Sequence, residues 1–346
     1  MKKNPYSLMF GKAPGQMISR MALTEEIYDS FLSENPPVMI YMLTGVRGSG
    51  KTVMMTEISE KIGRYKEWIT IELNPSRDLL EGLASKLYNE KGLMSIFQKA
   101  KINLSFFGIG VEIDGADQIY DIEVAISRML KVLKKNGKKV LVTIDEVVNS
   151  KEMQVFSSAY QIFIREDLPL FLIMTGLYEN IDALQNEKTL TFLFRAPKIR
   201  LGSLDIGSIA AHYRKEFDTD DDTSREMARL TKGFPFAFQV LGYYTYENNG
   251  DYKKAVPDFR QRLNEYVYDK IWSELSVNDK RVANAIVMSG TGRISDIREQ
   301  LSMESNEFAP YRDRLIKKGI VNGKERGRLT FELPLFEEYI KDNYIG

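Results

Sequence analysis

The chain has 346 residues, 43 % of them hydrophobic and 28 % charged, which is an ordinary globular composition and a length suited to about two or three domains. The absence of cysteine excludes a disulfide framework, a thiol nucleophile and thiolate-bound zinc, and a single histidine, His212, argues against a histidine-based metal cluster. Lysine plus arginine and aspartate plus glutamate both number 48, so no global field draws the chain to nucleic acid or to an anionic membrane.

The N-terminal segment lacks the pattern of a signal peptide. Lys2 and Lys3 are followed by Pro5, Gly11 and Pro14, which interrupt what would be the apolar stretch. The longest apolar run, 168–177, covers about half a bilayer span. We therefore expect a cytoplasmic protein without a membrane partner.

A phosphate-binding motif follows the first predicted strand. The apolar run 38–43 leads through Thr44 into the pattern G-x-x-x-x-G-K-T, and a helix is expected over 51–62. Glycines in this pattern let backbone N–H groups turn toward a β-phosphate, the lysine reaches the β- and γ-oxygens, and the threonine hydroxyl binds Mg²⁺. The strand and the helix favour a nucleotide site over a glycine-rich turn that precedes Lys-Thr by chance. The residues of the motif are Gly45, Val46, Arg47, Gly48, Ser49, Gly50, Lys51 and Thr52.

Two later strands end in polar residues, and ligands of open α/β sheets bind at the carboxyl edge of the strands. The apolar run 140–144 is followed directly by Asp145 and Glu146. Because a P-loop is present, Asp145 is expected to hold Mg²⁺ through water, and Glu146 is expected to deprotonate the attacking water. Without the P-loop, the same two carboxylates would be interpreted as a solvated acidic turn. The run 170–174 is followed by Thr175, which is expected to sense the γ-phosphate or to position the water, or else to cap the helix that begins near Leu177. The catalytic candidates are therefore Lys51, Glu146 and Thr175, and the metal candidates are Thr52 and Asp145.

The segment between the P-loop and Asp145 is long enough for an additional strand. Residues 67–73 are strand-like and 78–90 are helix-like. Alternation around Gly108, through 102–113, predicts a β-hairpin, and 119–133 has the spacing of an amphipathic helix. This order fits an additional-strand ATPase better than a nucleotide kinase.

These residues resemble the additional-strand P-loop ATPases of the AAA+ and STAND kind, particularly the prokaryotic ATP-binding proteins related to the origin-recognition initiator ATPases. The resemblance covers nearly the whole chain. It implies an α/β fold with three parts: a P-loop ATPase core with an additional-strand parallel sheet over 1–202, an α-helical lid over 203–273, and a winged helix-turn-helix over 274–346.

Further residues enter as candidates through the resemblance. The opening from Asn4 to Gly11, followed by Ser19-Arg20 where the family usually has Gly-Arg, is similar to the segment that packs on adenine. The run 231–236 resembles the Gly-x-Pro motif of STAND lids, in which the equivalent of Pro235 packs near the nucleotide; the same residues suit a helix end at Gly233 and a helix start at Pro235. Arg195 lies roughly where AAA+ proteins have an arginine finger, although a surface charge pair is the simpler interpretation. His212 flanks the apolar stripe of a lid helix and is interpreted as structural.

The C-terminal part has the pattern of a winged helix-turn-helix. Helices are predicted over 276–288 and 295–301, with a third that ends at Gly319 and that Pro310 should interrupt. A turn at Asn322-Gly323 and alternation over 329–333 predict a two-stranded wing. Seven basic residues against two acidic ones form a possible phosphate-binding face, although such modules also dock proteins and Glu304 and Glu307 would repel DNA. The basic residues are Arg312, Arg314, Lys317, Lys318, Lys324, Arg326 and Arg328.

The sequence thus predicts an ATPase switch that takes ATP or ADP with Mg²⁺ and repositions a winged helix, with double-stranded DNA or a protein as partner. The alternative is a nucleotide-stabilised adaptor with little turnover. A GTPase is disfavoured because the chain has no Asn-Lys-x-Asp motif. The sequence leaves the oligomeric state open.

Overall fold

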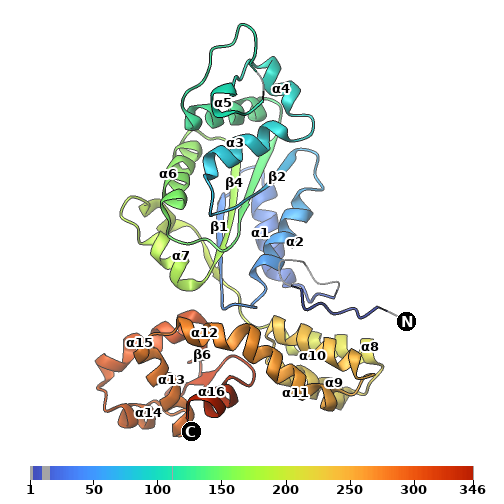
Figure 1. Cartoon of the computed structure of the whole chain (residues 1–346), viewed down its shortest axis with the longest axis vertical. Helices are drawn as coiled ribbons and strands as arrows, with labels where there is room; N and C mark the ends of the chain where they lie inside the picture. The colour runs from blue at the N-terminus through green and yellow to red at the C-terminus, as the bar shows by residue number, and fades with distance from the viewer. Residues whose placement is uncertain (1–2, 10–15, 111, 346) are drawn as a thin grey trace. The chain divides into compact units, whose positions relative to one another are not determined.

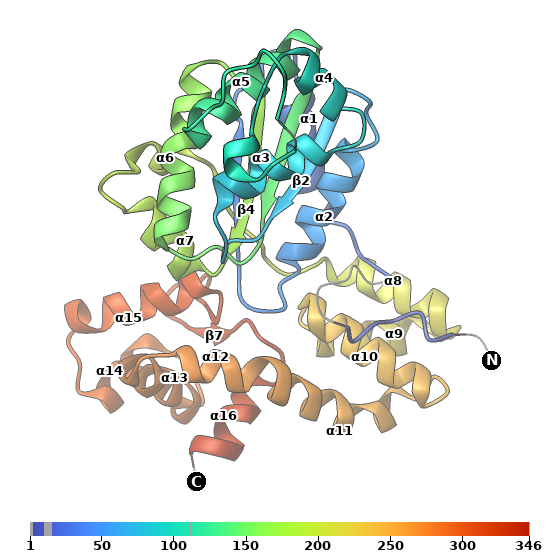
Figure 2. The same ribbon diagram turned by 45° about the horizontal axis from the view of Figure 1, so that its top comes forward.

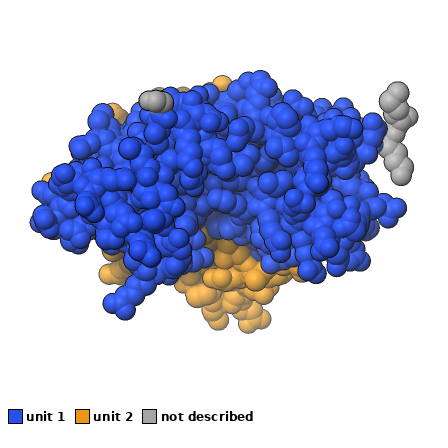
Figure 3. Space-filling model, turned by 90° about the horizontal axis from the view of Figure 1, so that it is seen from below, with its two compact units in different colours: residues 1–20, 45–50, 201–346 blue, residues 21–44, 51–200 orange. Residues whose placement is uncertain are grey.

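A computed structural model describes residues 3–9, 16–110 and 112–345. Phe10, Gly11 and Val111, which entered the predictions above, lie outside these ranges. The chain forms two compact units (Figure 3). Unit 1 comprises 1–20, 45–50 and 201–346, and unit 2 comprises 21–44 and 51–200. The proposed three-part division stays a prediction.

Unit 2 is built on a parallel five-stranded sheet in the order β2-β3-β4-β1-β5. Strand β2, which was predicted over 67–73, lies at one edge of the sheet, next to β3. The predicted strands at 38–43, 67–73, 140–144 and 170–174 are confirmed with shifted ends. The strands are β1 (Ile40–Thr44), β2 (Trp68–Leu73), β3 (Lys139–Ile144), β4 (Leu170–Gly176) and β5 (Lys198–Arg200).

Side chains alternate between the two faces of this sheet, as the two-residue period of a strand requires. Leu170 and Leu172 of β4 join the larger core of unit 2, whereas Phe171 between them packs on Phe31 of α1 with ring centroids 5.1 Å apart. Helices α1 and α2 lie side by side on one side of the sheet, and α6 lies on the other (Figures 1 and 2). Both faces are therefore covered, which explains why β1 and β4 are buried along their whole length.

The helices of unit 2 begin and end where local chemistry predicts. Asp121 caps α5 by accepting hydrogen bonds from the N–H groups of Glu123 and Val124, and Ser150 caps α6 by accepting from Met153. The predicted helix over 51–62 is confirmed as α2. The helices are α1 (Met21–Leu32), α2 (Lys51–Ile62), α3 (Leu79–Asn89), α4 (Met94–Lys99), α5 (Ile122–Lys135), α6 (Lys151–Arg165) and α7 (Tyr178–Gln185), with short 3₁₀ turns η1 (Ser105–Phe107) and η2 (Thr191–Arg195).

The β-hairpin predicted around Gly108 is wrong. The described residues of this segment form the 3₁₀ turn η1 instead, after the side chain of Asn103 accepts a hydrogen bond from the N–H of Ser105. Such an Asx turn competes with a strand. The alternation arose because Ile102, Leu104 and Ile109 are buried in the core of unit 2 from an irregular loop.

Unit 1 is largely helical, and one apolar core runs through both of its helical groups. The first group contains α8 (Ile206–Phe217), α9 (Asp221–Leu230), α10 (Pro235–Glu247) and α11 (Tyr252–Leu263). A π-helical turn, η3 (Asn264–Tyr268), leads into α12 (Asp269–Glu274). The second group contains α13 (Val277–Ser289), α14 (Ile294–Leu301), α15 (Ser305–Lys318) and α16 (Phe336–Tyr344), with the antiparallel strands β6 (Val321–Asn322) and β7 (Thr330–Phe331).

The N-terminal segment packs on the first helical group through Tyr6. Its ring is 3 % exposed and stacks on Phe217 at a centroid distance of 5.9 Å. A Cβ atom on Gly242 would lie 2.3 Å from this ring, so α10 needs a glycine there. The Tyr6 hydroxyl lies 3.1 Å from Nε2 of His212, whose pKa is lowered chiefly by burial. His212 is thus a partly buried packing residue, as the sequence indicated.

The second helical group contains the three predicted helices, α13 to α15, and a short wing in the predicted order, but Pro310 does not interrupt α15. The helix runs from Ser305 to Lys318, with a capping box between Glu304 and Glu307. Phe308 and Leu315, on either side of Pro310, are both buried, and this packing offsets the hydrogen bond that proline cannot donate. Within the described ranges, no helix combines the length and apolar composition of a membrane span.

Candidate functional site

The P-loop backbone has the conformation that its glycines were predicted to supply. Gly48 and Gly50 have φ values of 81° and 83°, in the left-handed region that side chains disfavour. The N–H of Ser49 donates to the carbonyl of Val46 at 3.1 Å, which closes the turn. Lys51 is 9 % exposed and begins α2 directly after this turn. The loop therefore leads into a helix N-terminus, where backbone N–H groups and the helix dipole favour an anion.

Asp145 joins three parts of unit 2 at the carboxyl edge of the sheet. Its Oδ2 accepts a hydrogen bond from the Thr52 hydroxyl at 2.6 Å, and its Oδ1 accepts from the Thr175 hydroxyl. The parallel register explains the second contact, because Met174 is paired with Ile144 and the next residue of each strand therefore lies at the same level. The sequence alternative that Thr175 caps α7 is wrong: Leu177 occupies the cap position and makes no side-chain cap bond.

Glu146 follows Asp145 in a left-handed backbone conformation, with φ at 53°. This conformation is uncommon outside glycine, asparagine and aspartate, and it is frequent at functional sites. The N–H of Glu146 donates to Oδ1 of Asp145 at 2.9 Å, and its side chain is exposed. The bend thus fixes the backbone of Glu146 on Asp145 while the carboxylate extends from the sheet edge.

The residues present fit a magnesium–nucleotide group. A threonine hydroxyl and a carboxylate already lie in hydrogen-bond contact, and Mg²⁺ in nucleotide sites takes few protein oxygens and completes its shell with phosphates and water. The hydroxyl of Ser49 is buried and has no hydrogen-bond partner within the described chain. A buried orphan hydroxyl beside backbone N–H groups suits a ligand that brings its own acceptor oxygens.

Within unit 1, the predicted Gly-x-Pro motif contacts the P-loop residues 45–50. The N–H of Phe236 donates to the carbonyl of Gly48 at 3.2 Å, and a Cβ atom on Gly48 would lie 2.8 Å from the ring of Phe234. Gly233, at φ 74°, ends the preceding turn, and Pro235 is the first residue of α10. The predicted helix start at Pro235 is therefore confirmed, whereas the predicted helix end at Gly233 is wrong, because α9 ends at Leu230 with Thr231 at its cap position. Phe234 and Phe236, which flank Pro235, lie against the P-loop.

Two arginines of unit 1 have roles that the sequence did not reveal. Arg20, expected near adenine together with Ser19, donates from Nη2 to the carbonyls of Ser49 at 2.9 Å and Gly202 at 2.7 Å. Arg47 of the P-loop forms an ion pair with Glu274 at the end of α12, with 3.8 Å between Nη2 and Oε1. No local pattern marks either contact, because the partners are distant in sequence.

Arg195 ends the turn η2 and is exposed, next to Phe194, which is 71 % exposed. No ion pair of Arg195 is found among the described residues, so the surface charge pair that we considered simpler is not observed there. Its assignment as an arginine finger stays a prediction.

The seven basic residues of the C-terminal face divide into two groups. Arg314 binds Asp279, whose side chain is 2 % exposed, through several hydrogen bonds of 2.6 to 3.0 Å, and Arg312 pairs with its neighbour Asp313. Arg328 donates from Nε to the carbonyl of Thr291 at 2.7 Å. These arginines are structural in whole or in part. Lys324 and Arg326 are exposed on the loop of the wing, and Lys317 and Lys318 lie at the end of α15.

Comparison with solved structures gives matches along almost the entire chain. A Walker-type ATPase of Pyrococcus abyssi is 17 % identical, with a TM-score of 0.64, over 94 % of this chain and 96 % of that one. The ORC2 protein of Aeropyrum pernix, in its ADPNP and ADP complexes, is 14 % identical, with a TM-score of 0.58, over 96 % of both chains. Cdc6p of Pyrobaculum aerophilum is 12 % identical, with a TM-score of 0.50, over 96 % of this chain and 95 % of that one.

The chain has the fold of an AAA+ P-loop ATPase related to the origin-recognition initiators. This AAA+ fold includes the parallel five-stranded sheet and the helical C-terminal region, as the sequence predicted. A family model described as a domain of unknown function, DUF8462, matches residues 265–340. No curated protein sequence matches the chain.

We expect Arg314→Ala to destabilise unit 1 of this AAA+ fold by about 2–4 kcal/mol, because it leaves the buried carboxylate of Asp279 without its counter-charge. Chemical denaturation monitored by circular dichroism measures the change. Arg326→Ala, which removes an exposed arginine from the same module, should change stability by less than about 0.5 kcal/mol. Equal effects of the two substitutions would contradict the structural role of Arg314.

Proposed function

We propose that the protein binds ATP with Mg²⁺, hydrolyses it, and uses the change of nucleotide to reposition its C-terminal winged-helix module. The observation that carries the proposal is the contact between Thr52 and Asp145 beside a P-loop whose glycines have left-handed backbone conformations. The AAA+ fold supports it, since nucleotide-bound structures exist among proteins of similar fold.

Binding begins at the P-loop. Backbone N–H groups between Gly45 and Thr52 and the N-terminus of α2 take the phosphates, and the ammonium group of Lys51 pairs with the β- and γ-phosphate oxygens. Thr52 and Asp145 hold Mg²⁺, which supplies charge neutralisation between the phosphate oxygens when bound. Because these two side chains already contact each other, little reorganisation is needed.

Hydrolysis requires a water molecule in line with the scissile bond. Glu146 orients this water and accepts its proton as the oxygen attacks the γ-phosphorus; the bond from the γ-phosphorus to the bridging oxygen breaks, and ADP and phosphate leave. The hydroxyl of Thr175 keeps Asp145 oriented. Thr175 is thus a positioning residue, and in addition its place at the strand end suits a sensor of the γ-phosphate.

The switch runs through contacts inside unit 1. Phe236 binds the carbonyl of Gly48, Arg20 binds that of Ser49, and Arg47 pairs with Glu274 on the helix that precedes α13. A nucleotide that changes the P-loop backbone therefore acts on residues that join the lid and the C-terminal module. The Gly-x-Pro contact also supports a STAND-like lid, in which the region around Pro235 reports the state of the nucleotide. Differential contacts of this kind are what any ligand-driven switch needs.

The partner we propose for the C-terminal module is double-stranded DNA, bound through the wing and the end of α15. Lys324 and Arg326 are exposed there and form no ion pair within the part of the chain that the structure describes, and Lys317 and Lys318 lie at the end of α15. Helix-turn-helix modules place such residues on phosphates. The alternative is an adaptor that binds nucleotide, hydrolyses it little and docks a protein through this module. The pairing of Arg312 and Arg314 with carboxylates favours it, because fewer cations are left for DNA.

Lys51→Ala should lower ATP affinity by about 10- to 100-fold, which corresponds to the loss of a charged hydrogen bond. Glu146→Gln should retain ATP affinity and lower kcat by about 10²- to 10⁴-fold, because only proton transfer is removed. Calorimetric ATP binding and phosphate release measure the two effects. Two substitutions in the same unit are matched controls: Lys61→Ala at a half-buried position and Glu152→Gln at an exposed one. Normal turnover in both site variants would refute the assignment.

Reversing two wing charges, Lys324→Glu with Arg326→Glu, should weaken duplex DNA binding and reduce the slope of log affinity against log salt by about 2 or more. Arg328 is left intact because it anchors the wing to Thr291. Fluorescence anisotropy with a labelled duplex over a salt series gives the slope, and Lys215→Glu with Lys253→Glu controls for net charge. Absence of duplex binding at low salt would contradict the DNA partner and favour protein docking.

A further inference from the structure

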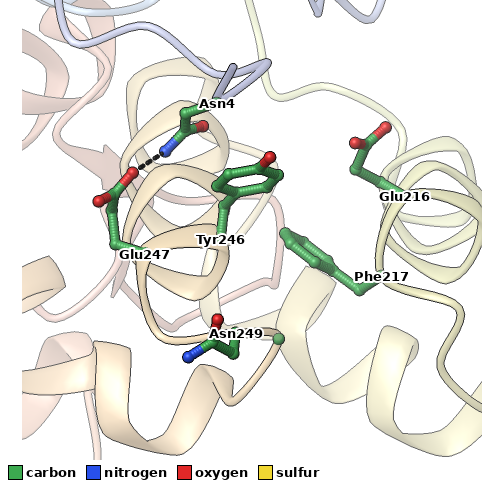
Figure 4. Close-up of a pocket in the computed structure, with 7 residues that line it drawn as sticks. Asn4, Glu216, Phe217, Tyr246, Glu247 and Asn249 are labelled. Atoms are coloured by element: carbon green, nitrogen blue, oxygen red, sulfur yellow. Dashed lines mark hydrogen bonds between the residues drawn. The ribbon is translucent and has the colours of Figure 1, made fainter. Parts of the chain in front are cut away.

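Unit 1 contains an open pocket of about 560 Å³ that the nucleotide proposal does not use. It lies among the N-terminal segment, the last turns of α8 and α10, and the turn between α10 and α11 (Figure 4). Its lining consists of Asn4, Glu216, Phe217, Tyr246, Glu247 and the Asn249–Gly250 turn.

The walls of this pocket are held in place by contacts behind them. The ring of Phe217 stacks on the buried ring of Tyr6, with an interplanar angle of 13°. The side-chain amide of Asn4 donates to Glu247 Oε1 at 2.7 Å, drawn as the dashed line in Figure 4, and to the carbonyl of Tyr243 at 3.2 Å. Because the ring of Phe217 and the carboxylate of Glu247 are held before any ligand arrives, binding costs less conformational entropy.

The electrostatics of the pocket favour a positive charge. Two carboxylates, those of Glu216 and Glu247, line it, and its described lining includes no lysine or arginine. Two helices, α8 and α10, also end there, at Phe217 and Glu247, and the last carbonyls of a helix carry partial negative charge. The two carboxylates supply the main negative potential in this hollow, and the two helix C-termini add to it.

The aromatic walls favour an organic cation over a metal ion. Tyr246 lies between the Asn4–Glu247 pair and the side chains of Phe217 and Glu216 in Figure 4. Ring faces attract ammonium and guanidinium groups through their quadrupole and also cover the methylene groups that carry them. A metal ion needs several oxygen or nitrogen ligands, and no group of three or more carboxylates or imidazoles in such an arrangement occurs in the described part of the chain.

We infer that this pocket binds an alkylammonium ligand, with the charged nitrogen between the carboxylates of Glu216 and Glu247 and the alkyl chain against Tyr246 and Phe217. The same chemistry is presented by a free linear polyamine and by a lysine side chain of another protein. The inference does not depend on the nucleotide site, because all of the residues involved lie in the lid and the N-terminal segment.

Isothermal titration of the full chain, without nucleotide, with spermidine and with a blocked tri-lysine peptide tests the inference. Glu216→Gln, Glu247→Gln and Tyr246→Leu should each weaken binding by about three- to tenfold, since each removes one partly exposed ion pair or one ring face. Glu299→Gln, which removes an exposed carboxylate from α14, is the matched control and should bind as the wild type does. Circular dichroism verifies that each variant is folded.

Tighter binding of spermidine than of the peptide would identify a free polyamine as the source, and the reverse order would identify a protein segment; either supports the site. Unchanged affinity in the folded double variant Glu216→Gln/Glu247→Gln would overturn the inference. Failure of both probes to bind at about 1 mM would overturn it as well. Neither result bears on ATP binding, so failure here is distinguishable from failure of the nucleotide proposal.

Discussion

The carboxylate of Asp145 is the constraint on which the candidate site depends. It stands at the end of β3, where parallel register brings Thr175 of β4 to the same level, and it accepts hydrogen bonds from both Thr175 and Thr52. The same carboxylate holds the backbone of Glu146 in its left-handed bend. One side chain thereby links the ends of β3 and β4, the start of α2 and the backbone of the proposed base.

The P-loop residues 45–50 are held by a second set of contacts, which are made with other parts of unit 1. Gly48 needs its glycine for two reasons, because its φ is positive and because Phe234 occupies the space a Cβ atom would take. The carbonyls of Gly48 and Ser49 are bonded to Phe236 and Arg20. In the proposed mechanism, the residues that cradle phosphate are therefore bonded directly to Arg20 and to the first turn of α10, and a change of nucleotide need not be transmitted over a long path.

Local patterns predicted the parts of this structure that local physics decides. The apolar runs gave the strands, and the strand–glycine loop–helix order located α2 from Lys51 to Ile62. The hairpin predicted from apolar alternation around Gly108 was wrong, because alternating residues can also reach a core from an irregular loop. The helix break predicted at Pro310 was wrong, because the buried residues on either side of it stabilise α15. Helix α16 was not predicted, although Phe336, Tyr339 and Ile340 have helical spacing and are buried.

Contacts between distant segments were not accessible from sequence. Nothing near Arg20 or Arg47 indicates Ser49 or Glu274 as partners, and Asp279 gives no local sign that it will bury its charge against Arg314. The pocket of unit 1 that is lined by Glu216 and Glu247 is built from three separate stretches of the chain. Of the candidate site, the motif residues were predictable because chemistry dictates their spacing, whereas their supporting contacts depend on the tertiary fold.

The measurement that tests the central claim most directly is the magnesium dependence of ATP binding, by calorimetry, in the wild type and in Asp145→Asn. The amide keeps the size of the carboxylate and removes its charge. We expect Mg²⁺ to strengthen ATP binding by the wild type, and we expect this gain in affinity to be largely lost in Asp145→Asn. In the absence of Mg²⁺, the two proteins should bind ATP with similar affinity. An equal gain from Mg²⁺ in both proteins would contradict the role of Asp145.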